Sequence, residues 1–265
     1  MTEENDNKPI LASCKKIELL APLRWLTLGW QDCKKAPLHS ALYGLFVVLL
    51  SYFIFSIAWH YHSVTLALAL LSAFIFIAPI LCIGLYSIAR QLKRDKPIDF
   101  GKSIRHGISP YGDVLIFVII MMVISLVWAR AASMIHIFFP TDAGAGFSEL
   151  VIFLGIGSLV GSLFAILIFS VSVFSLPMIM DKKTDMITAC ISSVNAVLKN
   201  KTTMLFWALI IVILTGIGIL SAFIGLFVII PLLGYSTWHG YRECLEVSDW
   251  EDRIDEFSKP TSLAE

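Results

Sequence analysis

The sequence contains a long stretch from Thr203 to His239 that has no Asp, Glu, Lys or Arg. A helix of about 20 apolar residues crosses the bilayer core, which is about 30 Å thick. The whole chain is 57% hydrophobic and 15% charged, whereas soluble domains have about 45–50% and about 25%. Lipid must therefore solvate much of this chain, and the sequence predicts an all-α polytopic transmembrane helical bundle.

Four other apolar runs are long enough to span a membrane, and residues 203–239 are too long for one span. Glycine lowers helix propensity, so we predict a break at Gly216-Ile217-Gly218. Without that break the chain would have five spans and its C-terminus would lie outside. The six predicted spans lie at about residues 41–59, 64–89, 114–136, 150–180, 203–217 and 219–239.

Basic residues are distributed very unevenly around these spans. Nineteen of the twenty Lys and Arg residues lie before span one, between spans two and three, between spans four and five, or after span six. Only Arg130 lies towards the other side. The positive-inside rule then predicts that both termini lie in the cytoplasm. Residues 1–16 are predicted to be a disordered tail, and the acidic tail 246–265 to be disordered or surface-bound. The membrane domain is predicted at residues 17–245.

The spans also suggest an internal repeat. Each of three helical hairpins begins with an amphipathic segment and has a proline near the inner end of its second span, at Pro79, Pro177 and Pro231. Such segments are typical of helices in the membrane interface, although ordinary packed connectors have the same pattern. The apolar stripes are Leu19, Leu23, Leu26 and Trp30; Phe100, Ile104 and Ile108; and Ile187, Ile191, Val194 and Leu198.

The predicted spans lack the side chains that ion transport, metal or haem binding, or catalysis would need. None carries an Asp, Glu, Lys or Arg deep within it, and such groups usually mark ion or proton pathways. The six histidines lie near span ends or in loops, so no haem pair or metal set is predicted. No catalytic set emerges, and the zero net charge argues against nucleic acid as a partner. We expect no cofactor and no enzymatic activity.

Small residues line one side of the fourth span. Gly157, Gly161 and Ala165 recur every four residues, a spacing that lets helix backbones approach closely. The pattern predicts a helix-packing face. It leaves open whether the face packs within the chain or against a second copy or another membrane protein.

The end of the sixth span reads Pro231-Leu-Leu-Gly234-Tyr-Ser-Thr-Trp238-His239-Gly-Tyr241-Arg242. This stretch resembles the closing signature of an uncharacterised family of bacterial integral membrane proteins, domain of unknown function 2189. Tyr235 stands where that family often has His. The resemblance implies a multi-pass inner membrane protein of no known activity. Three further stretches fit it: Trp25-Leu-x-x-Gly29-Trp30-x-Asp32 with Pro37 and Tyr43-Gly44, Ala78-Pro79 with Gly84-Leu85-Tyr86, and Ser193-Val194 with Asn200.

Aromatic and charged residues gather at the predicted cytoplasmic rim and could contact lipid or a partner. This rim cluster consists of Trp30, Asp32, Trp238, His239, Tyr241 and Arg242. Arg242 could bind a lipid phosphate or a carboxylate, and we hypothesise that it pairs with Asp32. A structural, interaction or assembly role in the membrane is the first functional hypothesis. The alternatives are a permease for a neutral or lipid-like substrate and an accessory subunit of a respiratory or redox complex.

Overall fold

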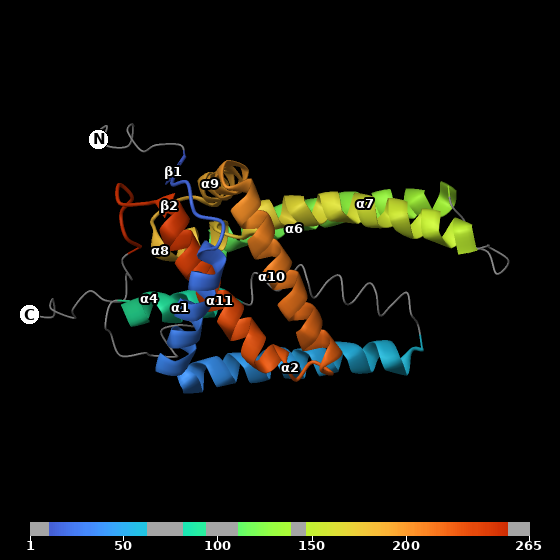
Figure 1. The fold of residues 1–265 in the computed structure, drawn as a ribbon, viewed down its shortest axis with the longest axis horizontal. Helices are drawn as coiled ribbons and strands as arrows, with labels where there is room; N and C mark the ends of the chain where they lie inside the picture. Colours follow the sequence, from blue (N-terminus) through green and yellow to red (C-terminus); the bar gives the residue numbers. More distant parts are fainter. Residues whose placement is uncertain (1–10, 63–81, 94–110, 139–146, 254–265) are drawn as a thin grey trace, which may run out of the picture.

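The structure is a computed structural model and describes residues 11–62, 82–93, 111–138 and 147–253 (Figure 1). Helices make up nearly all of this part, as the all-α prediction requires. The helices are α1 (Ala21–Lys35), α2 (Pro37–His60), α4 (Ile83–Lys93), α6 (Tyr111–Phe138), α7 (Phe147–Ser172), α8 (Ser175–Asp181), α9 (Met186–Lys199), α10 (Lys201–Leu220) and α11 (Leu226–Cys244). Two short strands, β1 (Ser13–Cys14) and β2 (Leu245–Glu246), flank them.

Within the described residues, four helical stretches are long and apolar enough to cross a membrane: Pro37–Ile57, Gly112–Ile135, Val151–Asp181 and Lys201–Leu220. They coincide with the first, third, fourth and fifth predicted spans. The second predicted span lies mostly outside the described residues, and the sixth corresponds to α11. These helices agree with a helical membrane protein, while the count of six spans stays a prediction.

The predicted break at Gly216-Ile217-Gly218 is wrong in position. Helix α10 continues through both glycines to Leu220, and the chain reverses between Ser221 and Gly225. In lipid a helix keeps its backbone groups bonded to one another, so a glycine alone gives little reason to stop it. Ser221 supplies the partners at the turn, because its Oγ accepts from Gly225 N at 2.9 Å and donates to Gly218 O at 2.8 Å.

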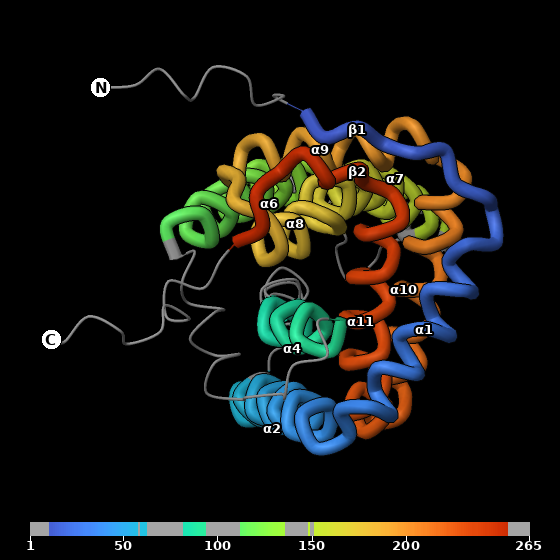
Figure 2. The backbone as a smooth tube through the Cα atoms, turned by 90° about the vertical axis from the view of Figure 1, so that its left-hand side faces the viewer, coloured from blue at the N-terminus to red at the C-terminus, as the bar shows by residue number. Residues whose placement is uncertain are grey.

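Helix α11 is the centre of the packed part of the molecule. It contacts α1 along its length and also α2, α4, α8 and α10. Helices α6 and α7 form a hairpin that points away from this body, and α10 runs across the space between this hairpin and α2 (Figures 1 and 2). The α6–α7 hairpin packs mainly on itself and on α8 and α9. Because α10 crosses the hairpin's direction, the arrangement of three equivalent hairpins stays a prediction.

The two ends of the described chain meet. Strand β1 pairs antiparallel with β2, with Cys14 opposite Leu245, and Lys15 N donates to Cys244 O at 2.9 Å. Asn200 holds the N-terminal strand further, donating to Lys15 O and accepting from Ile17 N. We call β1 and β2 together the terminal clasp.

Parts of both predicted disordered tails are therefore ordered. Ala12 and Cys14 are buried in the first, and Val247 and Trp250 are buried in the second. Apolar side chains within a polar tail gain free energy by leaving water, and the body provides a place for them. Residues 1–10 and 254–265 lie outside the described part.

Two of the three predicted amphipathic segments are the helices α1 and α9, and the third lies outside the described residues. The apolar stripes point outwards: Leu23 and Trp30 are exposed on α1, as are Ile187 and Leu198 on α9. The opposite faces, which carry mostly small or apolar side chains, pack on the body. Outward apolar stripes suit helices that lie at a membrane surface.

Candidate functional site

The contact between α1 and α11 brings two of the predicted rim residues together. His239 Nε2 lies 2.7 Å from Asp32 Oδ2. Glycines allow the helices to approach this closely. A Cβ at Gly29 would lie 2.9 Å from Ser236 N, and a Cβ at Gly240 would lie 3.0 Å from the Trp25 ring. The small residues of both quoted stretches thus serve packing between α1 and α11.

Trp25 is the centre of this contact, although the sequence placed it only in a stretch of the family resemblance and not in the rim cluster. Its side chain is fully buried, its Nε1 donates to Glu243 Oε2 at 2.8 Å, and its ring meets Trp207 edge-on at 5.6 Å. Glu243 also pairs with Arg24. The sequence did contain a pattern that indicates this buried face, because Trp25, Gly29 and Asp32 follow helical spacing on the side of α1 opposite the apolar stripe.

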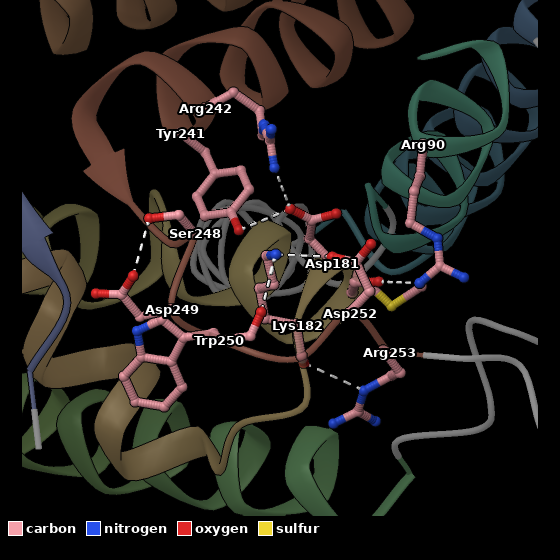
Figure 3. Close-up of polar contacts among 11 residues, drawn as sticks. Arg90, Asp181, Lys182, Tyr241, Arg242, Ser248, Asp249, Trp250, Asp252 and Arg253 are labelled. Carbon is pink, nitrogen blue, oxygen red and sulfur yellow. Dashed lines mark hydrogen bonds and ion pairs between the residues drawn. The ribbon is translucent and has the colours of Figure 1, made fainter. Parts of the chain in front are cut away.

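Arg242 does not pair with Asp32, contrary to the hypothesis. Its Nη1 donates to Asp181 Oδ2 at 2.7 Å, and the hydroxyl of Tyr241 donates to the same oxygen at 3.0 Å (Figure 3). Successive helical residues are rotated by about 100°, so His239 faces α1 while Arg242 faces the end of α8. Burial raises the pKa of Tyr241 well above its usual value, so the phenol remains a neutral donor.

The end of α8 is a meeting point for four chain segments. Arg90 of α4 donates to Met180 O at 2.6 Å, and Arg253 N donates to Asp181 O at 3.0 Å. Lys182 Nζ donates to Trp250 O at 3.0 Å and to Asp252 Oδ1 at 2.7 Å. Asp181 is only 4% exposed and Lys182 only 6%. The one sequence signal for this group was the charged triplet that directly follows the apolar run, residues 181–183.

The predicted rim cluster therefore separates into parts. Asp32 and His239 join α1 to α11, while Tyr241 and Arg242 join α11 to α8. Trp238 is buried with its ring 5.6 Å from that of Tyr241. Trp30 faces outwards, with Lys34 Nζ 5.5 Å from its ring.

Comparison with known families tests the suggested resemblance. Residues 66–181 match the model of the family DUF2189, described as a predicted integral membrane protein. The DUF2189 resemblance is thus confirmed over this segment, which includes Ala78-Pro79 and Gly84-Leu85-Tyr86. The match ends at Asp181, and the stretches quoted from α1 and α11 lie outside it. No curated protein and no solved structure matches the chain.

The small-residue face of α7 falls within the DUF2189 segment and is open. No described atom lies within 4 Å of a Cβ built at Gly157 or Gly161. Ala165, on the same side, is exposed. The face is therefore not used for packing within the described part of the chain.

Two hollows lie among the described residues near the helix ends. The larger, about 680 Å³, is an open apolar surface lined by Tyr52, Phe55, Ser56, Trp59 and His60 of α2. The smaller, about 250 Å³, is mostly polar and lies beside the terminal clasp. No group of three or more His, Cys, Asp or Glu residues in the described part could hold a metal ion. The permease and redox-subunit alternatives stay predictions.

Proposed function

We propose that this protein has a structural or assembly role in the bacterial inner membrane, where its α6–α7 hairpin associates with a second membrane protein or a second copy. The proposal includes six spans with both termini in the cytoplasm. The observation that carries it is the exposure of this hairpin. In the 18-residue apolar window of α7, 0% of the residues are buried inside the protein.

The character of α7 supports a protein partner in addition to lipid. Lipid alone would solvate a uniformly apolar helix, but Gly157, Gly161 and Ala165 leave a shallow, smooth face. Helices in membranes associate through such faces, because close backbone contact replaces the hydrophobic driving force that is absent there. The body, in contrast, is closely packed around α11.

The cytoplasmic orientation is supported by the charged residues of the body. Arg90, Lys182, Arg242 and Arg253 gather around the end of α8, next to the terminal clasp (Figure 3). Charge on this scale belongs outside the hydrocarbon core. The positive-inside rule then favours the cytoplasmic side for this part of the molecule.

Photocrosslinking in native membranes tests the association. A photoreactive residue replaces Ala165 on the small-residue face, and a matched control replaces Leu163, which is also exposed but lies about 200° away around α7. We expect a discrete protein adduct from position 165 and none from position 163. An adduct of twice the chain mass indicates a second copy, and any other mass indicates a different partner.

A second variant links the adduct to the packing face. Gly161→Leu adds a side chain into open space, so the fold is retained while close backbone approach is blocked. The adduct from position 165 should disappear. An unchanged adduct, or no protein adduct from position 165 in the parent protein, refutes the proposal.

A further inference from the structure

The smaller hollow, which we call the clasp hollow, is built from three distant parts of the chain. It has a volume of about 250 Å³ and is lined by Lys15, Lys182, Arg242, Leu245, Glu246, Val247 and Ser248. Lys15 follows β1, Lys182 follows α8, and the others belong to the end of α11 and to β2 with the residues after it. The hollow exists only because the terminal clasp brings these parts together.

Cations dominate its lining. Lys15, Lys182 and Arg242 face a single lining carboxylate, that of Glu246. Lys15 Nζ lies 3.4 Å from Glu246 Oε1, but both side chains are about half exposed or more, so this pair stabilises little. Arg242 and Lys182 pair instead with Asp181 and Asp252, two carboxylates that do not line the hollow.

The two less exposed cations have donor capacity left over. Arg242 donates to Asp181 through one terminal nitrogen, and its other N–H groups have no partner within the part of the chain that the structure describes. Lys182 uses two of its three N–H groups, on Trp250 O and Asp252 Oδ1. Figure 3 shows Lys182 at the end of α8 and Arg242 reaching Asp181 from α11. They are held in position by their existing bonds before any ligand arrives.

A nearby lysine responds to the same two cations. The pKa of Lys93 is lowered, first by burial and then by the charge of Arg242, with Lys182 adding to it. Asp181 and Asp252 oppose this shift but do not reverse it. Among the charged groups that act on Lys93, Arg242 has the largest effect.

We infer that the clasp hollow binds a phosphate group, either of an anionic lipid headgroup or of a soluble phosphorylated compound. A guanidinium fork and fixed ammonium groups match the charge and the acceptor oxygens of phosphate. The volume accommodates a phosphate with a small polar substituent. Ser248 adds a hydroxyl at the same wall. A bound phosphate would connect the N-terminal segment, the end of α8 and the end of α11 through one ligand.

The first measurement is calorimetric titration of inorganic phosphate into the full chain in an uncharged detergent at constant ionic strength. Lys15→Gln removes an exposed cation of the hollow, and Lys16→Gln removes the neighbouring exposed cation that does not line it. Charges about 4 Å apart in water interact by an energy that corresponds to about a five-fold change in affinity. We expect Lys15→Gln to weaken binding about five-fold and Lys16→Gln to leave it unchanged.

Removing a negative charge from the hollow distinguishes a direct effect on phosphate binding from an effect on folding. Glu246→Gln removes the one carboxylate of the lining, so it should tighten phosphate binding about five-fold. A residue that served only to hold the clasp together would weaken binding when replaced. Absence of saturable binding, equal effects at Lys15 and Lys16, or weaker binding in Glu246→Gln overturns the inference.

Repeating the titration in lipid nanodiscs identifies the source of the phosphate. One sample contains phosphatidylcholine alone and the other contains equal parts phosphatidylcholine and phosphatidylglycerol. Loss of inorganic phosphate binding only in the second sample shows that the anionic headgroup occupies the hollow. Equal binding in both shows that the hollow takes a soluble phosphate compound.

Discussion

Asp32 and His239 should be energetically coupled, and Asp32 and Arg242 should not. Asp32 Oδ2 lies 2.7 Å from His239 Nε2, with the two side chains 10% and 26% exposed. A hydrogen bond that involves a charged group stabilises a protein by about 1.5–3 kcal/mol, whereas an exposed pair contributes about 0–1 kcal/mol. For this partly shielded pair we expect a coupling energy of about 1.5 kcal/mol.

Double-mutant cycles measure this coupling. The variants Asp32→Ala, His239→Ala and Arg242→Ala, alone and in pairs, are unfolded by sodium dodecyl sulfate in mixed micelles and followed by far-ultraviolet circular dichroism. Because Arg242 binds Asp181 instead, its effect should add to that of Asp32 within about 0.5 kcal/mol. Coupling below about 0.5 kcal/mol for Asp32 with His239, or above it for Asp32 with Arg242, would refute the assigned pairing.

Three further predictions use the same unfolding assay. Gly29→Ala should destabilise the protein by about 1–3 kcal/mol through its clash with α11, while Gly157→Ala, whose Cβ meets no described atom, should not destabilise it; equal effects would contradict the packing. Trp250→Ala should lower the free energy of unfolding by about 3 kcal/mol because Trp250 is buried, and an exposed, disordered tail would show no loss. Asp185 caps α9 by accepting from Thr188 N at 2.9 Å, so Asp185→Ala should cost about 1 kcal/mol at neutral pH. Burial raises the pKa of Asp185, but hydrogen bonds from Thr188 and neighbouring backbone groups lower it overall. The stabilisation is therefore present above the unfolded pKa of about 3.9 and is lost as the pH falls through the lower folded pKa; a difference from Asp185→Ala that grows on acidification would contradict the cap.

The spans could be located from sequence because lipid imposes a uniform requirement on every exposed position. Helices α2 and α6 begin and end within a few residues of their predicted bounds. The turn after α10 was predicted at the wrong position because the prediction relied on the low helix propensity that glycine has in water. The side chain of Ser221, which satisfies the turn, carries no signal that separates it from other serines.

The candidate site was only partly predictable, because its pairs depend on rotation about helices and on segments far apart in the chain. The motif at the end of α11 indicated that His239 and Arg242 matter, but not that they face different neighbours. Asp181 and Trp25 are distant from α11 in sequence. The terminal clasp was missed because two strands of two residues each have no periodicity, and an acidic composition alone suggested disorder for residues 247–253.

The pairing of β1 with β2 has a consequence for biosynthesis. The partner strand of residues 13 and 14 lies more than two hundred residues later in the chain. During translation the N-terminal segment can dock on α9 and Asn200, but it cannot form the terminal clasp until residues 245 and 246 have left the ribosome and α11 has reached its position. The first part of the body to be made is among the last to become ordered. An N-terminal strand that lacks its β2 partner would then mark a chain whose final helix had failed to assemble.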